Sequence, residues 1–198
     1  LVPQEETIVA LTKSGYIKRM PRGIFKSQRR GGKGVTGMSV RETDNIRLLT
    51  NANTHDELLV FTNKGRVFSL KVWELPEGSR TSKGQAIINL INIEGEERGQ
   101  AILPLGKEDL DKKDTYLFFT TRQGTVKKTL LSQYANIKSN GLIAINLTKK
   151  DQLVWVNQTS GDHHILLVTR DGKSIRFKES DVRATKRDTM GVRGISLK

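Results

Sequence analysis

Four times along this chain, a short apolar run ends in the pattern Thr-x-x-Gly. The four runs, at 8–12, 58–62, 117–121 and 165–169, are rich in β-branched or aromatic residues. Their glycines, Gly15, Gly65, Gly124 and Gly172, lie 50, 59 and 48 residues apart. Such runs are typical of strands, and a glycine at the end of a four-residue turn suits a hairpin. We therefore predict one β-hairpin in each of four repeats.

A second glycine follows the first in every repeat, after 17 to 19 residues, at Gly34, Gly84, Gly141 and Gly191. Apolar residues then alternate with polar ones, as Ile88 and Leu90 do around Asn89. This period of two predicts a third strand with one buried face. Further apolar runs predict a fourth strand at 46–50, 100–103 and 152–156.

Repeats of about 50 residues with four strands each are typical of propeller blades. We predict an all-β fold, one domain over residues 1–198, with repeats at about 6–53, 56–106, 114–160 and 163–198. The fourth repeat reaches the end of the sequence after its third strand, so its blade is predicted to be incomplete. Only brief helical turns are expected, at 130–134 and 180–183.

Three smaller features are predicted to be structural. The charged stretch 106–114 and the acidic turn at Glu94, Glu96 and Glu97 are interpreted as solvated loops. Trp73 and Trp155 lie in or beside apolar runs, so we expect them to pack in the core or between blades.

The positive charge of this chain is concentrated near its two ends. The formal net charge is +13, and residues 13–41 contain nine Lys or Arg and no acid. Residues 163–198 contain nine basic residues and four acids. Concentrated charge of one sign indicates a polyanionic partner. Nucleic acid is favoured over a membrane, because Pro21 and Gly23 interrupt any basic amphipathic helix.

Metal and catalytic sites are not expected. The chain has no Cys and only three His, namely His55, His163 and His164, too few for a structural zinc site. No signal peptide or membrane segment is recognised, which predicts a cytoplasmic location.

The loop Gln28-Arg29-Arg30-Gly31-Gly32-Lys33-Gly34 carries three cations among three glycines. Glycine lets a ligand approach the backbone amides, while Arg and Lys supply charged donors, so such a loop suits phosphate. A P-loop is excluded, because Gly34 follows Lys33 where Ser or Thr is required.

The order of residues 28–34 resembles the signature box in the C-terminal domain of the DNA gyrase A subunit, and every position of that box is present. Together, the box and the four repeats extend this resemblance over nearly the whole chain. The resemblance implies a β-pinwheel, a propeller-like disc whose neighbouring blades exchange strands. It also implies that double-stranded DNA wraps around a basic rim, which supports ATP-driven negative supercoiling.

The family's catalytic tyrosine follows an arginine, whereas Tyr16, Tyr116 and Tyr134 do not, so we expect no catalysis by this chain. ATP and magnesium are expected elsewhere in the holoenzyme, with no cofactor in this chain. The implied partners are DNA, the rest of the gyrase A subunit, and the gyrase B subunit. The implied location is the bacterial cytoplasm, at the nucleoid.

The candidate DNA-binding residues fall into three groups. The resemblance carries over Gln28 to Gly34. The charge pattern adds Lys18, Arg19, Arg22 and Lys26. The matching loops of later repeats add Arg80, Lys83, Lys138, Arg183, Lys186 and Arg187.

Two alternatives remain open. The equivalent domain of topoisomerase IV has a degenerate box, which the intact Gln28 to Gly34 disfavours. A propeller that serves as a protein-interaction scaffold is disfavoured by the concentrated charge and by the lack of WD40-type dipeptides.

Overall fold

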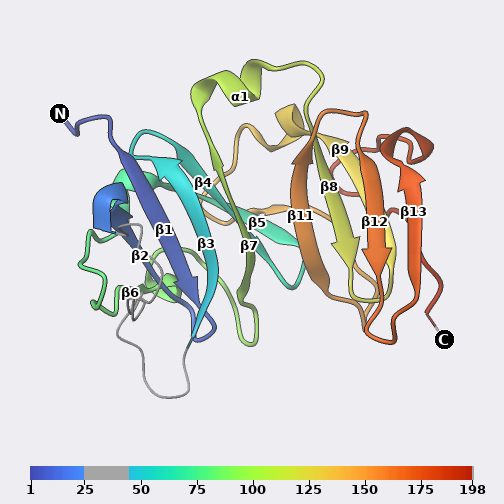
Figure 1. Cartoon of the computed structure of the whole chain (residues 1–198), viewed down its shortest axis with the longest axis horizontal. Helices are drawn as coiled ribbons and strands as arrows, with labels where there is room; N and C mark the ends of the chain where they lie inside the picture. Colours follow the sequence, from blue (N-terminus) through green and yellow to red (C-terminus); the bar gives the residue numbers. More distant parts are fainter. Residues whose placement is uncertain (25–44, 198) are drawn as a thin grey trace, which may run out of the picture.

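The structure, a computed structural model, describes residues 1–24 and 45–197. Within these ranges it contains three four-stranded antiparallel sheets and one two-stranded sheet. Figure 1 shows the sheets side by side, with the first repeat on the left and the fourth on the right. The all-β architecture predicted from the repeats is confirmed.

The elements have the following bounds. The first sheet has the order β3 (Ile46–Asn53), β1 (Glu6–Thr12), β2 (Tyr16–Pro21), β6 (Gln85–Ala86). The second has the order β10 (Leu142–Ile143), β5 (Arg66–Lys71), β4 (Glu57–Thr62), β7 (Gly99–Leu105). The third has the order β11 (Leu153–Thr159), β8 (Tyr116–Thr121), β9 (Thr125–Leu130), β14 (Val192–Arg193), and the fourth pairs β12 (His164–Val168) with β13 (Ser174–Lys178). The described helices are α1 (Lys107–Asp111) and the 3-10 turns η1 (Arg22–Ile24), η2 (Val72–Glu74), η3 (Ile87–Asn89), η4 (Leu131–Tyr134) and η5 (Glu179–Asp181).

The four predicted hairpins are present, and the structure explains their threonine. In the second repeat, the hydroxyl oxygen of Thr62 accepts a hydrogen bond from the amide of Arg66 across the turn, at 3.2 Å. The side chain thereby satisfies a backbone donor that the turn leaves free. The same bond recurs at 3.0–3.1 Å in the other three repeats, where the acceptors are Thr12, Thr121 and Thr169.

Neighbouring sheets exchange strands. The short strand β6 follows Gly84 of the second repeat but pairs with β2 of the first, with Ile17 opposite Gln85. In the same way β10 of the third repeat pairs with β5, and β14 of the fourth pairs with β9. Each complete sheet therefore combines strands from two consecutive repeats, as the resemblance implies.

The predicted third strand is shorter than expected, and in the second repeat its buried positions are shifted, whereas Ile145 of the third repeat is buried as predicted. Beyond Ala86 the chain leaves the sheet edge and forms η3, where Ile87 is buried and Ile88 is 62% exposed. The amide of Ile87 donates to the carbonyl oxygen of Gly15 at 2.8 Å. This bond draws the chain toward the preceding hairpin and ends the extended conformation.

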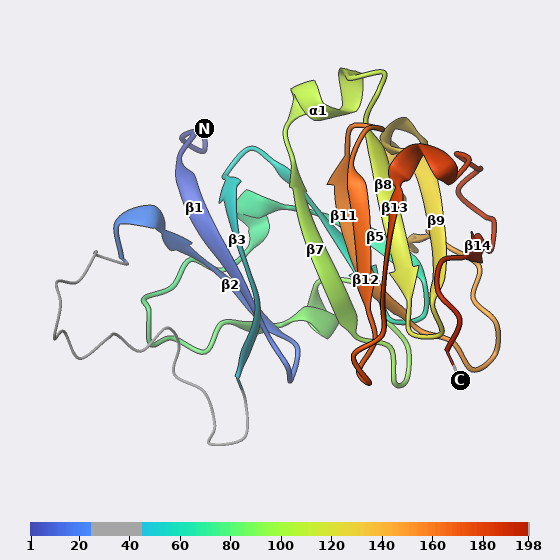
Figure 2. The same cartoon turned by 45° about the vertical axis from the view of Figure 1, so that its right-hand side comes forward.

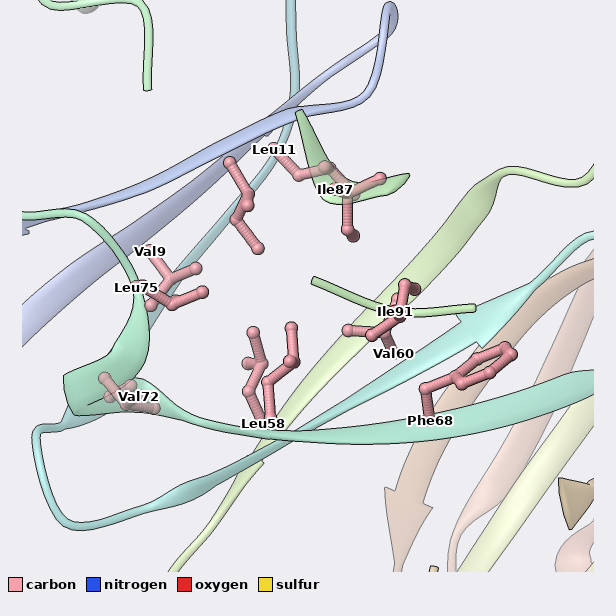
Figure 3. Packing of buried hydrophobic residues seen from close by; sticks show 12 residues of the cluster. Val9, Leu11, Leu58, Val60, Phe68, Val72, Leu75, Ile87 and Ile91 are labelled. Carbon is pink, nitrogen blue, oxygen red and sulfur yellow. The ribbon is translucent and has the colours of Figure 1, made fainter. Parts of the chain in front are cut away.

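The hydrophobic core lies between the sheets. Successive side chains of a strand point to opposite faces, so Leu58 and Val60 of β4 pack toward the first sheet, whereas Leu59 and Phe61 pack toward the third. Figure 3 shows the first of these clusters, in which Leu58 and Val60 lie below Val9 and the other side chains of the first repeat. Strands with two buried faces explain the almost uninterrupted apolar runs in the sequence.

The strands β3, β7 and β11 lie next to one another, so they form the inner side of the arrangement. The exchanged strands occupy the opposite end of each four-stranded sheet. Figure 2 shows the fourth sheet in front of the third; Ile165, Leu167 and Phe177 pack there against Phe118 and Val126.

Two segments that were expected to be solvated loops differ from that prediction: one contains a helix and the other a buried ion pair. The stretch 106–114 contains α1, whose first turn is capped by Asp109, which accepts from the amide of Gly106 at 2.9 Å. In the acidic turn, Glu97 is buried and pairs with Arg66 at 2.5 Å. Since α1 has only five residues, no helix in the described ranges is long enough to cross a membrane.

Candidate nucleic-acid interface

We call the outer edge of the sheets the rim. It consists of β6, β10 and β14 and the loops that precede them, at 77–84, 136–141 and 183–191. The backbone fixes the first and third of these loops to the preceding repeat. Arg19 forms a parallel bridge with Glu77, and Lys128 forms the corresponding bridge with Ala184. Matching loops of successive repeats are therefore placed at matching points along one edge.

Four of the candidate cations on the rim are exposed, and they come from three repeats: Lys83, Lys138, Arg183 and Lys186. The ammonium of Lys83 lies 4.1 Å from the centre of the Tyr16 ring, a cation–π contact that holds this side chain on the rim. Positive charge at regular points along a surface can follow the phosphates of a duplex.

Four further candidate cations differ in their burial and in the hydrogen bonds and ion pairs that they form within the protein. Arg19 donates from Nε to the carbonyl oxygen of Leu75 at 3.1 Å and pairs with Glu77 at 2.6 Å. Arg187 is half-buried and donates to the carbonyl oxygen of Ile143 at 2.5 Å. Arg22 is exposed and pairs with Glu6, and Arg80 is half-buried. Arg19 and Arg187 therefore hold rim loops in place in addition to any contact with a ligand.

Lys18 is not available to a ligand, contrary to the prediction from charge. Its side chain is fully buried, and its ammonium donates to the carbonyl oxygens of Ser79, Arg80 and Ser82, each at 2.8 Å. Lysine has three N–H donors, and all three are used. Burial lowers the pKa of Lys18 below its ordinary value.

A second buried lysine, Lys127, was not among the candidates. Its ammonium donates to the carbonyl oxygens of Ala144, at 2.6 Å, and Arg187, and lies 5.0 Å from the centre of the Phe119 ring. Burial, together with the charge of Arg187, lowers the pKa of Lys127 to about 7. The sequence does hold a signal for this role, because Lys127 and Lys18 both come three residues after the first glycine of their repeats.

The remaining candidates, Lys26 and the loop from Gln28 to Gly34, lie outside the residues that the structure describes. Their role therefore stays a prediction.

The two tryptophans do not pack as expected. Trp73 is 37% exposed and Trp155 is 63% exposed. Trp155 lines an open cavity of about 950 Å³ between the third and fourth sheets, together with residues of β12 such as Leu166. The prediction that both rings pack in the core or between blades is not met, because both are exposed, although Trp155 does lie at the space between two sheets.

Comparison with known proteins gives a consistent result. A family model described as the DNA gyrase C-terminal domain, a β-propeller, matches residues 6–49, 56–98, 115–160 and 163–198. The A subunit of DNA gyrase from Halalkalibacterium halodurans is 47% identical over 196 residues, which is 99% of this chain and 23% of the relative. The A subunit from Escherichia coli K12 is 44% identical over 197 residues, covering 100% of this chain and 22% of the relative. This chain thus spans less than a quarter of these curated relatives.

Solved structures show the same arrangement. The C-terminal domain of a DNA topoisomerase IV superposes with a TM-score of 0.80 at 35% identity, covering 100% of this chain and 59% of that one. A DNA gyrase A C-terminal domain superposes with a TM-score of 0.78 at 31% identity, covering 98% and 61%. Together with the strand exchange, these likenesses confirm the predicted β-pinwheel fold.

Proposed function

This chain belongs to the DNA gyrase C-terminal domain family, and on that premise we propose that it binds, bends and wraps double-stranded DNA without sequence preference. The wrap supports ATP-dependent negative supercoiling by a holoenzyme that contains the rest of the gyrase A subunit, together with the gyrase B subunit. This chain contributes binding and no catalysis, and it acts at the nucleoid in the bacterial cytoplasm.

The observation that carries this proposal is the placement of exposed cations from three successive repeats along one rim. Lys83, Lys138 and Arg183 belong to equivalent loops, each preceding an exchanged strand. No described helix or ribbon projects from the rim to read base edges, so phosphate contact is favoured over base readout.

The energetics are compatible with such contacts. If the rim and the box neutralise about six to ten phosphates, affinity falls by about 10³–10⁵ between 50 and 200 mM salt. The contacts must offset DNA bending, which costs about 1–6 kcal/mol for a site of 20–30 base pairs. Exposed charges from three successive repeats along one edge suit this task.

The equivalent role in topoisomerase IV is the second candidate, because the fold of that domain is as similar as the fold of the gyrase domain. The complete box from Gln28 to Gly34 favours gyrase.

The test measures the linking number of relaxed circular DNA that is ligated in the presence of the protein. We expect the protein to change the linking number and the triple variant Arg29→Ala, Arg30→Ala, Lys33→Ala to lose most of this effect. The control removes the same charge away from the rim, by Lys107→Ala, Lys112→Ala and Lys113→Ala, all at exposed positions in or after α1. The wrapping proposal fails if the unaltered protein leaves the linking number unchanged.

A further inference from the structure

Each of the four hairpin turns carries one cation that was not among the candidate residues. Two residues lie between the threonine and the glycine of a turn, and in every repeat one of them is basic: Lys13, Lys64, Arg122 and Arg170. All four are exposed. None of them forms an ion pair with another described residue. We call these four residues the turn row.

The backbone places the turns at equivalent points of the repeats. The amide of Lys13 donates to the carbonyl oxygen of Asn45, just before β3, at 2.9 Å, and the same bond recurs in the next two repeats at 3.1 and 2.8 Å. On its other side the turn is bonded to the next repeat, as Gly65 is to the amide of Ala144 at 2.8 Å. Figure 1 shows β1, β8 and β12 running down to their turns, whereas α1 lies at the opposite end of the sheets.

The turn row adjoins the rim. The ammonium of Lys83 lies 4.1 Å from the centre of the Tyr16 ring, and Tyr16 comes directly after the first turn. In the third repeat, β14 places the exposed Arg193 opposite Thr125, which comes directly after the third turn. Cations of the rim and of the turn row are therefore neighbours in these two repeats.

Acidic residues accompany the later turns. Glu97 accepts from the turn residue Thr62 at 2.6 Å, which brings the exposed Glu94 and Glu96 to the second turn. Asp151 accepts from the amide of Gln123 in the third turn at 2.9 Å. Glu94 and Glu96 carry two negative charges where Lys64 carries one positive charge, so the second turn is the place where acids most oppose an anionic ligand.

We infer that the turn row forms a second line of phosphate contacts, so that one wrapped duplex rests on both the rim and the turns. The grooves of a duplex are about 6 and 12 Å wide, and two neighbouring lines of cations suit phosphates of both strands across a groove. The inference rests on the proposed function. It extends the interface to four residues outside the box and the rim.

The first measurement is the salt dependence of DNA affinity. The turn-row variant combines Lys13→Ala, Lys64→Ala, Arg122→Ala and Arg170→Ala. We expect it to reduce the slope of log affinity against log salt by about three to four, since each lost phosphate contact accounts for about 0.9.

The matched control removes the same charge at the other end of the sheets, at exposed positions, by Lys107→Ala, Lys112→Ala, Lys113→Ala and Lys178→Ala. Its slope should stay close to that of the unaltered protein. Equal slopes for the two variants would overturn the inference and leave the proposed function standing. If the unaltered protein does not bind DNA, the proposed function itself fails.

A gain of affinity provides an independent test at the second turn. Glu94→Gln with Glu96→Gln should raise DNA affinity by about two- to fivefold, the effect of a surface charge pair. The control is Glu108→Gln with Asp111→Asn, which removes two exposed acids from α1. An equal gain in the control, or none in either variant, would show that the duplex does not reach the second turn.

Cross-linking keeps the inference testable if the fourfold variant does not fold. The chain contains no cysteine, so a single introduced cysteine can carry a photoreactive group. We expect groups at Lys13→Cys and Arg122→Cys to cross-link a bound duplex, and a group at Lys112→Cys to leave it unlinked. If DNA binds and the groups at the turns do not cross-link, the inference is wrong.

Discussion

Gly65 and Ile145 belong to consecutive repeats, yet the carbonyl oxygen of Gly65 accepts a hydrogen bond from the amide of Ile145 at 3.1 Å. The first glycine of a repeat thus accepts a hydrogen bond from the next repeat, at the point where the chain leaves the exchanged strand. The equivalent bond joins Gly124 with Ile195 at 3.1 Å, and in the first repeat Gly15 accepts from Ile87, one position earlier in the chain, at 2.8 Å. These junctions connect each sheet to the next repeat.

The second glycine of the second, third and fourth repeats should be intolerant of a side chain. Gly84 has a φ of +82°, and a Cβ there would lie 2.5 Å from the carbonyl oxygen of Ile17. The left-handed conformation costs an alanine about 1–2 kcal/mol, and displacing the neighbouring strand costs about 1–3 more. We expect Gly84→Ala to lower the free energy of unfolding by about 2–5 kcal/mol in urea denaturation.

Gly172 provides the control, because its φ is +80° but a Cβ would meet nothing within 4 Å. Gly172→Ala should lower the free energy of unfolding only by the cost of the left-handed conformation, about 1–2 kcal/mol. Equal losses at the two glycines would contradict the close approach of Gly84 to Ile17.

The turn threonines should differ in importance according to burial. Thr62 is fully buried, accepts from the amide of Arg66 and donates to Glu97 at 2.6 Å. Among the described residues, the hydroxyl of Thr169 makes only the turn bond, to the amide of Lys173, and this bond is exposed to solvent. Since an unsatisfied buried partner costs about 1–3 kcal/mol, Thr62→Val should destabilise the protein by about 2–3 kcal/mol. Thr169→Val should cost about 0.5 kcal/mol in the same thermal denaturation assay, and the reverse order would refute this account.

Glu97 should make the protein sensitive to acid. Burial alone would raise the pKa of Glu97, but hydrogen bonds from Arg66 and Thr62 outweigh it, so the pKa lies below its ordinary value near 4.5. A carboxyl group whose pKa is lowered by folding stabilises the folded state at pH values above its ordinary pKa. This stabilisation is lost as the pH falls through the lowered pKa. Glu97→Gln should cost about 1–3 kcal/mol at neutral pH.

The measurement is urea denaturation of both proteins between neutral pH and a pH well below the ordinary carboxyl value. The free energy difference between them should narrow as the pH falls below about 4.5. A constant difference would show that Glu97 has the same pKa in the folded and unfolded chain.

Lys127 should also make the stability rise with pH, but in the neutral to alkaline range. Its pKa is lowered to about 7 from the ordinary value of 10.5, first by burial and then by Arg187. Between these two values the unfolded chain binds a proton that the folded chain releases, so stability rises with pH. Relative to Lys127→Met, the unaltered protein should gain less than about 1.4 kcal/mol per pH unit over this interval. Parallel pH profiles would contradict the lowered pKa.

The sequence predicts hairpins well, because a hairpin is local. The groups that Thr62 and Gly65 bind within their turn lie at most four residues away. The local pattern of residues is therefore sufficient to predict the hairpin. The fourth strand of the first three repeats is also recognised, since its apolar run is long enough to bury a face.

The exchanged strands are not determined by local pattern. The alternation around Ile88 predicts a regular strand, but the bond from Ile87 to Gly15 turns the chain after two strand residues. Whether β6 pairs with its own repeat or with the preceding one depends on contacts between segments far apart in sequence. Only the resemblance to a family carried that information.

The role of a cation cannot be predicted from charge alone. Lys18 and Lys83 look alike in the sequence, yet Lys18 is fully buried under a loop and Lys83 is exposed. Net charge counts both equally, whereas burial depends on whether another repeat covers the strand. The recurrence of lysine at positions 18 and 127 is the available signal, and it indicates a structural position.

The strand exchange also means that no sheet can be released by cutting the backbone at one place. A protease that cleaves between the exposed Lys112 and Lys113 would give two fragments, yet β10 of the second fragment would still pair with β5 of the first. The shared core around Phe61 and Phe119, whose ring centres lie 5.7 Å apart, would hold them as well. We therefore expect the nicked protein to migrate as one particle in gel filtration and to separate only when it is denatured.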